Sequence, residues 1–426
     1  MSASRDDAAS HAADDPRRAP PVLVVPRALL CTPERWIEGG ALLVAAGRIV
    51  EVVASPRRRV RLAARSVRRV ELADAVVTPG FVNAHAHLEL SGLRGRTARG
   101  ASFSAWIGSV LRARGSLGAD EWNAAWSLGA QRALATGTTL VADIDSTGAW
   151  SRARGPRPRL LVLRELLDAF DARRTPSVLE HLHAPGPRRA RTSNGLSPHA
   201  PHTVGNTLLD AIARFAARHA TRLGVHWAET PEEGDWLERG TGPFAALLGA
   251  SPRQRGLARL AERGLLNERA TLYHGNAARP FELDELARAR ATLVHCPGTH
   301  AFFGREPVDV PGWLGRGVRV ALGTDSLASN DDLDLALELA RLRSAYPALP
   351  PARAWELATL GGARALGAEG RAGELRAGAW ADFAVWSIDR VEHAAALEAL
   401  TTRAATLRSV WLAGRPVDLG LAGAAW

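Results

Sequence analysis

The sequence predicts an α/β protein: a (β/α)8 TIM-type barrel with a small β-sandwich domain built from both ends of the chain. Eight apolar, β-prone segments alternate with helical patterns through the middle of the chain. Polar residues, many of them histidine, follow several of these segments, and both chain ends are rich in short β segments. A barrel of this kind takes about 250 residues, so the 426 residues leave room for a second, smaller module.

The two chain ends supply the strands of the expected sandwich. Short apolar segments precede the turn at 78–80, and turn residues separate them. The same pattern returns near the C-terminus in "GELRAGAWADFAVWS" and "RSVWLAGRPVDL". The expected organisation is a polar, disordered tail at 1–20, sandwich segments at 21–77 and 371–426, and a barrel at 78–370.

The barrel strands are expected where apolar runs end in polar residues. The eight segments are 81–87, 138–143, 160–165, 194–199, 223–228, 270–274, 291–296 and 319–325. Helical periodicity lies between several of them, as in 120–136 and 206–220. Trp122 and Trp126 recur at helical spacing, which predicts packing against the barrel. In such barrels the active-site groups lie at the C-terminal ends of the strands.

Composition narrows the possible functions. The formal net charge is +10, which raises the possibility of a polyanionic partner. However, all 54 basic residues are arginine, and the basic run at 55–70 has no interleaved aromatic residues for stacking on bases. We therefore expect no nucleic-acid partner. The absence of lysine also excludes a Schiff-base lysine and a carboxylated lysine bridging two metals, so any metal site should be mononuclear.

Cysteine usage and hydropathy favour a cytoplasmic protein. Cys31 and Cys296 are the only cysteines and lie far apart, which predicts no disulfide framework. The first 20 residues have no apolar core of the kind found in signal peptides. No apolar stretch is long enough to span a membrane.

Candidate metal ligands and catalytic residues follow the predicted strands. His85 and His87 form an H-x-H pair after the first strand, which alone is weak evidence for a metal site. The C-terminal ends of the other strands add further polar residues, namely His199, His226, Glu229, His274 and Asp325. Three imidazoles and one carboxylate suit zinc, with iron or manganese as alternatives, and such a metal lowers the pKa of a bound water to ~7.

Other histidines give no such signal. His181 and His183 form a second H-x-H pair in a charged connection, where we expect surface exposure. The roles of His202, His295 and His300 stay open at this point. The segments 92–118 and 299–316 are expected to shape the pocket and set specificity, and the arginines that meet a substrate are not identified.

The ordered set of motifs resembles the amidohydrolase superfamily, and within it the adenosine-type and chlorohydrolase-like deaminases. The matching segments are "PGFVNAHAHLEL", "SPHAPHTV", "VHWAET", "YHGN", "HCPGTHAFFG" and "LGTDSLASN". The resemblance implies one divalent metal ion, with a homo-oligomer and a small-molecule substrate. It implies these site residues: His85, His87, His226 and Asp325 as metal ligands, Glu229, His274 and Asp325 as catalytic residues, and His199 and Glu229 as substrate contacts.

Within that superfamily the chain is most similar to the aminodeoxyfutalosine deaminases of menaquinone biosynthesis. The implied reaction is attack of metal-bound hydroxide on C6 of the purine of 6-amino-6-deoxyfutalosine. Thioadenosine deaminases carry a ribose-binding Glu before a Trp after strand one, whereas this chain has Ala105 before Trp106. They also carry Tyr where this chain has His202, and both departures count against a thioadenosine substrate.

Four alternatives remain. They are a S-adenosylhomocysteine or methylthioadenosine deaminase, a chlorohydrolase, a guanine-deaminase-like enzyme, and a non-catalytic scaffold. The scaffold is disfavoured because the whole ligand set and Glu229 are present. A polynucleotide-editing deaminase needs an H-x-E and P-C-x-x-C zinc site, which two distant cysteines cannot form.

Overall fold

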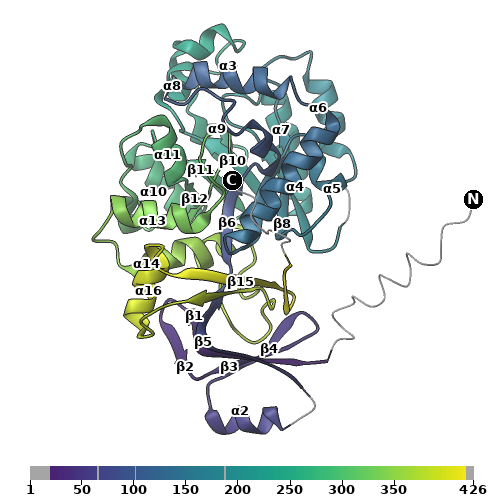
Figure 1. Cartoon of the computed structure of the whole chain (residues 1–426). Helices are drawn as coiled ribbons and strands as arrows, with labels where there is room; N and C mark the ends of the chain where they lie inside the picture. Colours follow the sequence, from purple (N-terminus) through teal and green to yellow (C-terminus); the bar gives the residue numbers. More distant parts are fainter. Residues whose placement is uncertain (1–19, 65–66, 101, 187–188, 419–426) are drawn as a thin grey trace, which may run out of the picture.

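A computed structural model describes residues 20–418, apart from 65–66, 101 and 187–188. It contains an eight-stranded barrel surrounded by helices and a second eight-stranded sheet below it in the view of Figure 1. The predicted fold class is confirmed. The tail expected at 1–20 lies outside the described residues, except for Pro20.

The eight barrel strands are parallel and follow one another in chain order around the barrel. Every segment expected from the sequence forms a strand. They are β6 (Phe81–Ala86), β7 (Thr138–Asp145), β8 (Arg159–Leu166), β9 (Thr192–Pro198), β10 (Leu223–Trp227), β11 (Ala270–His274), β12 (Thr292–His295) and β13 (Arg319–Leu322).

The barrel closes where the ends of β6 and β13 meet. The backbone N–H groups of Thr324 and Asp325 both donate to the carbonyl of His85 at 3.0 Å, and Ala86 bridges Asp325 in parallel. The register of β6 against β7 shifts between Asn83 and Ala86, an irregularity that re-aims side chains at the strand end. The first and last barrel strands are therefore joined at the rim where the polar residues lie.

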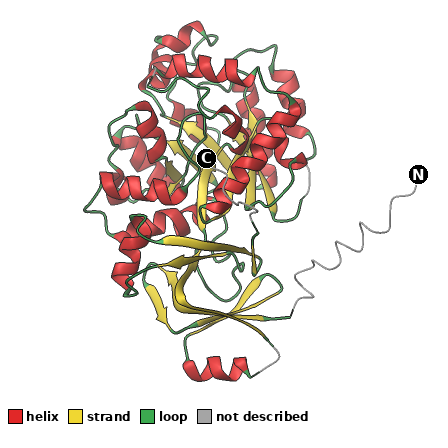
Figure 2. Cartoon of the chain, viewed as in Figure 1, coloured by secondary structure: helices red, strands yellow, loops and turns green. Residues whose placement is uncertain are grey.

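Helices surround the barrel strands on the outside, as Figure 2 shows. Those of the barrel are α3 (Phe103–Arg114), α4 (Ala119–Ala135), α5 (Ala149–Arg152), α6 (Thr175–His183), α7 (Asn206–His219), α8 (Pro231–Gly234), α9 (Gly256–Ala261), α10 (Pro280–Ala289), α11 (Pro297–Phe303), α12 (Val310–Gly315), α13 (Leu335–Ala345), α14 (Pro351–Glu356) and α15 (Gly362–Ala365). Short 3-10 turns η1 (Leu88–Leu93) and η3 (Pro243–Ala246) and π-helical turns η2 (Asp235–Arg239) and η4 (Leu357–Gly361) complete the set.

Trp126 of α4 ties that helix to the barrel. Its indole Nε1 donates to Asp143 Oδ2 of β7 at 2.6 Å, and the other carboxylate oxygen accepts the backbone N–H of Leu88 at 2.9 Å. Burial raises the pKa of Asp143 well above its usual range. The predicted packing role of Trp126 is confirmed, and through Asp143 it also holds the segment that directly follows His87.

The second sheet comes from both ends of the chain. Its strands are β1 (Val22–Thr32), β2 (Arg35–Glu38), β3 (Ala41–Ala45), β4 (Arg48–Val53), β5 (Arg68–Pro79), β14 (Phe383–Ser387), β15 (Thr406–Leu412) and β16 (Arg415–Pro416). β1 and β5 are parallel, and the other pairs are antiparallel. Helix α2 (Pro56–Ala63) contacts β4 of this sheet. Helix α16 (His393–Thr401) packs against α13 and α14 of the barrel, and His393 at its start stacks on Trp36 of β2.

Aromatic residues join the second sheet to the amino-terminal end of the barrel. Phe81, the first residue of β6, packs against Trp355 and Trp386 with ring centroids 5.1 and 5.9 Å away. Trp386 Nε1 also donates to Thr78 Oγ1 at 3.0 Å. Aromatic side chains therefore close the amino-terminal end of the barrel, and a functional site is expected at the opposite, carboxyl end. Within the described residues, no helix has the length and apolar content needed to cross a membrane.

Candidate active site

Four predicted metal ligands meet at the carboxyl end of the barrel. His85 lies in β6 and His87 directly after it, His226 lies in β10, and Asp325 follows β13. His87 Nε2 is 3.2 Å from His226 Nε2 and 3.9 Å from Asp325 Oδ1. His85 Nε2 is 3.5 Å from the same oxygen. The donor atoms of His85, His87 and His226 lie within 4.8 Å of one another. Those of His85, His274 and Asp325 form a second such group, so the two groups overlap at His85.

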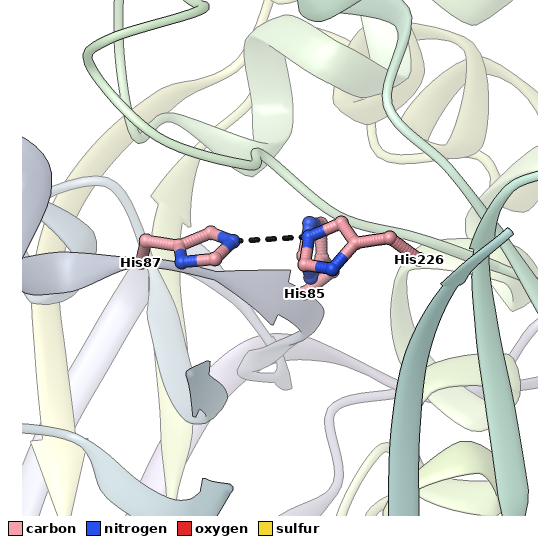
Figure 3. A group of neighbouring side chains, drawn as sticks. All are labelled: His85, His87 and His226. Carbon is pink, nitrogen blue, oxygen red and sulfur yellow. Dashed lines mark hydrogen bonds between the residues drawn. The ribbon is translucent and has the colours of Figure 1, made fainter. Parts of the chain in front are cut away.

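One hydrogen bond fixes which nitrogen of His226 faces this cluster. His226 Nδ1 lies 2.9 Å from the backbone carbonyl oxygen of His199. Because a carbonyl only accepts, Nδ1 carries the proton. The lone pair of Nε2 then points at His87 Nε2, and Figure 3 shows the two rings facing each other. A backbone carbonyl holding the distal N–H is a common way of orienting a metal-binding histidine.

His85 supplies the clearest test of whether the cluster fits a metal. Both of its ring nitrogens are buried, and neither has a hydrogen-bond partner among the described residues. Its ring stacks on Tyr273 with centroids 3.8 Å apart. Burial lowers the pKa of His85 well below its usual range, so the ring is neutral. An unpaired buried imidazole costs free energy, and a metal ion at Nε2 would remove that cost.

Asp325 offers one free carboxylate oxygen to the cluster. Its Oδ2 accepts hydrogen bonds from Ser329 Oγ at 2.8 Å and Thr299 Oγ1 at 3.1 Å. Burial raises the pKa of Asp325, but the surrounding imidazoles led by His274 outweigh it, and the pKa is lowered. Oδ1 therefore belongs to an ionised carboxylate that faces His85. The donor set of three nitrogens and one oxygen fits zinc.

Glu229 and His274 form a pair beside the ligands. Glu229 follows β10, His274 ends β11, and Glu229 Oε2 lies 3.6 Å from His274 Nε2. Glu229 Oε1 lies 3.6 Å from Arg305 Nη1. Burial raises the pKa of Glu229 to about 8, although Arg305 opposes the shift. A carboxyl that titrates near neutrality can both take and return a proton there.

Three residues at these strand ends have left-handed backbone. Ala228, His274 and Asp325 have φ of 49°, 74° and 55°. This conformation is costly for residues other than glycine, and such strain is often found at functional sites. Backbone hydrogen bonds hold it at two of them: Ala277 N–H donates to the Ala228 carbonyl at 2.8 Å, and Asp325 N–H donates to the His85 carbonyl at 3.0 Å.

The cluster opens into a cavity of about 540 Å³, a size suited to a small molecule. Phe103, Trp106 and Val110 of α3 form part of its apolar wall, and α3 lies across the upper end of the barrel in Figure 1. His199, predicted as a substrate contact, lines the cavity, and its Nδ1 lies 2.7 Å from Thr203 Oγ1. The charged residues along the wall include Arg114, Glu165 and Arg174.

Residues 76–417 match the model of the amidohydrolase family. The chain belongs to the amidohydrolase family. The predicted recognition and enzyme class, a hydrolase of carbon–nitrogen bonds, are confirmed at this level.

Two curated relatives and one solved structure illustrate what this amidohydrolase is similar to. It is 30% identical over 392 residues to a 5-methylthioadenosine/S-adenosylhomocysteine deaminase of Syntrophobacter fumaroxidans, covering 86% of this chain and 84% of that one. It is 32% identical over 348 residues to an aminodeoxyfutalosine deaminase of Deinococcus radiodurans, covering 75% and 80%. A zinc-bound adenosine deaminase from Xanthomonas campestris is 25% identical with a TM-score of 0.77, covering 93% and 92%. Together with the ligand cluster, this neighbour confirms the predicted divalent-metal cofactor.

The three histidines whose roles were left open lie around the site of this amidohydrolase, and His202 also lines the cavity. His202 Nδ1 lies 3.5 Å from Glu233 Oε2. His300 Nε2 lies 2.7 Å from Asn276 Oδ1, and Asn276 Nδ2 donates to the backbone carbonyl of Glu229 at 3.0 Å. His295 and His300 contact each other edge to face, with ring centroids 4.9 Å apart. These histidines therefore organise the strand ends around Glu229. The second H-x-H pair, His181 and His183, is exposed at the end of α6, as expected.

Sequence reasoning missed three charged groups at this site, namely Glu233, Arg305 and Glu165. Glu233 had a usable signal, because Thr230-x-x-Glu233 has the spacing of a helix-capping pair. Arg305 lies two residues after α11 and stacks its guanidinium on Phe303 at 4.3 Å. No local pattern marks it among the many arginines of the chain.

Proposed function

We propose that this amidohydrolase removes the 6-amino group of a purine nucleoside by hydrolysis. The observation that carries the proposal is the Glu229–His274 pair, 3.6 Å apart, directly beside the cluster of metal ligands. Both residues line a cavity large enough for a nucleoside. The names of the relatives, deaminases of nucleosides, support the same chemistry.

His85, His87, His226 and Asp325 would hold one divalent ion, as the sequence resemblance implies. When bound, the ion would activate water at neutral pH. The buried histidines of this set are kept neutral by desolvation, so their lone pairs are available without first losing a proton.

The proton transfers fall to residues of this chain. Glu229 takes a proton from the attacking water and delivers it to N1 of the purine, and its pKa of about 8 is close to what that task requires. His274 Nε2, which faces Glu229, orients the attacking water toward C6. Asp325 accepts the second proton and passes it to the amine, so that the C6–N bond breaks and ammonia leaves. His199 contacts the substrate from the end of β9.

The finer proposal is that the substrate is 6-amino-6-deoxyfutalosine, which would place the protein in menaquinone biosynthesis in the cytoplasm, as a homo-oligomer. Ala105 supports it, because thioadenosine enzymes are expected to carry glutamate there. Deamination of S-adenosylhomocysteine or methylthioadenosine is the second candidate. It is favoured by the relative of that name, whose identity of 30% is close to the 32% of the aminodeoxyfutalosine enzyme.

A panel of substrates tests both the general proposal, a nucleoside deaminase, and the finer one, the identity of the substrate. The zinc-loaded protein is incubated with aminodeoxyfutalosine, S-adenosylhomocysteine, methylthioadenosine, adenosine, guanine and atrazine, and ammonia and chloride are measured. Ammonia released fastest from aminodeoxyfutalosine supports the finer proposal. Ammonia released only from S-adenosylhomocysteine or methylthioadenosine would show that the substrate is one of these and not aminodeoxyfutalosine. If no nucleoside releases ammonia, the deaminase proposal itself is contradicted.

A further inference from the structure

Glu165 presents a carboxylate to the cavity from the inward face of barrel strand β8. Its neighbour Arg164 points outward, where Nη1 donates to the backbone carbonyl of Ala184 at 2.8 Å. Because side chains alternate along a strand, Glu165 continues the inward row of Leu161 and Leu163, which pack inside the barrel. The row thus changes from apolar to acidic at the C-terminal end, where barrel enzymes place functional groups.

The carboxylate of Glu165 has no hydrogen bond or ion pair with any described residue. Nearby Glu89 differs, because its oxygens accept from the hydroxyls of Ser146 and Thr147, the latter at 2.6 Å. Asp145 accepts the backbone N–H of Gly148 at 2.8 Å. Of these three neighbouring acids, Glu165 is the one that lines the cavity and also the one left without a donor.

The electrostatic surroundings leave this acceptor available to a ligand. Burial raises the pKa of Glu165 to about 7, and the charge of Glu89 adds to the shift. Arg114 lowers the pKa but is engaged elsewhere, since Nη2 donates to Ser146 Oγ at 2.7 Å. Hydrogen-bond donors on a bound molecule would therefore stabilise a carboxylate that the protein itself leaves unsatisfied.

We propose that Glu165 determines substrate specificity by accepting hydrogen bonds from the 2′- and 3′-hydroxyls of the nucleoside ribose. The inference rests on the proposed nucleoside deaminase function. Two carboxylate oxygens match two adjacent hydroxyl donors, and Glu165 lines the same cavity as Glu229 and His274. The α3 segment, which also lines this cavity, offers no carboxylate for this task.

The test compares adenosine with 2′,3′-dideoxyadenosine as substrates of the zinc-loaded wild type, E165Q and E165A. The wild type is expected to prefer adenosine by about 100-fold in kcat/KM, since each hydrogen bond to a charged acceptor is worth about tenfold or more. E165A should reduce that preference to less than about fivefold, through a rise in KM for adenosine. E165Q, which keeps one acceptor oxygen, should show a preference for adenosine between those of the wild type and E165A. If E165A does not fold, the comparison of E165Q with the wild type is the test.

Glu338→Gln is the matched control. Glu338 is another buried acid whose pKa burial raises to about 7, but it lies outside the cavity and accepts from Gly298 N–H and Asn330 Nδ2. Any loss in E338Q should fall equally on both substrates, which leaves the preference within about twofold of the wild type.

The outcomes separate this inference from the function on which it rests. If E165A and E165Q lose activity equally on both nucleosides, or if the wild type shows no preference for adenosine, the ribose contact is wrong while the deaminase function stands. If neither adenosine nor its dideoxy analogue is a substrate, KM for the fastest nucleoside of the panel is compared between the wild type, E165Q, E165A and E338Q, and an unchanged KM in E165A refutes the ribose contact. If no nucleoside of the panel releases ammonia, both proposals fall.

Discussion

The carboxylate of Glu233 accepts the backbone N–H of Glu229 at 2.8 Å. Its two oxygens also accept the N–H groups of Ala228 at 3.0 Å and Thr230 at 3.3 Å. One buried side chain thus anchors three successive amides around the proposed proton carrier, in a turn where Ala228 has left-handed backbone. The pKa of Glu233 is lowered, because His202 and these amides outweigh the effect of burial, so it stays ionised and can accept all three bonds.

Replacing Glu233 should therefore reduce turnover without removing the metal. Glu233→Gln keeps one acceptor oxygen and places an NH2 group against backbone donors, which misplaces Glu229. We expect kcat to fall by about 10- to 100-fold with KM nearly unchanged, since displacement of a catalytic group by about 1 Å costs up to about 100-fold. Steady-state ammonia release and zinc content measure the effect. The control is Glu232→Gln, one residue earlier, and an equal kcat in E233Q and E232Q would refute the anchoring role.

His85→Ala should abolish metal binding. The wild type is expected to bind about one zinc ion per chain, and H85A should bind close to none after dialysis, because the variant loses the buried nitrogen that faces Asp325. Zinc should also raise the Tm of the wild type but not that of H85A, since a ligand stabilises the folded state that binds it. His181→Ala removes an exposed histidine on α6 and should keep both properties. Full zinc occupancy in H85A would contradict the ligand assignment.

Asp145 should make stability depend on pH. Burial, followed by the charge of Glu89, raises the pKa of Asp145 from its usual 3.8 to about 7. Between these values the folded protein holds a proton that the unfolded chain has released, so stability falls as pH rises toward 7 and levels off above it.

The variant Asp145→Asn removes this titration and keeps the oxygen that accepts from Gly148. The free energy of unfolding of D145N, relative to the wild type, should therefore increase by about 2 kcal/mol between about pH 5 and about pH 8. Urea denaturation at both pH values measures it. A difference that does not change with pH would show that Asp145 titrates normally in the folded protein.

The sequence could predict the barrel and the metal ligands because each rests on a local pattern with one spatial consequence. Apolar runs ending in His85, His226 or Asp325 identify strands, and parallel strands in a closed barrel bring their C-terminal ends to one rim. The residues at these strand ends therefore lie close together in any closed barrel, regardless of how the surrounding side chains pack. The same argument placed Glu229 and His274 beside them, and the structure confirms that they lie together.

Side chains that depend on strand register or on loop paths could not be predicted in the same way. Glu165 points inward and Arg164 outward, a difference of one residue that the charged pair "RE" does not reveal. Arg305 reaches Glu229 only because the residues after α11 bring it beside the turn that follows β10. Glu233 depends on the left-handed turn at Ala228, which brings three amides toward its carboxylate.

The most direct test of the account is ammonia release by Glu229→Gln, measured beside the wild type on the fastest substrate of the panel, with zinc content determined on the same preparations. Glutamine fills the same space but cannot carry the proton. We expect one zinc ion per chain in both proteins and a kcat at least about 100-fold lower in E229Q. Normal turnover in E229Q with zinc bound would show that Glu229 does not transfer the proton, and the proposed mechanism would be wrong.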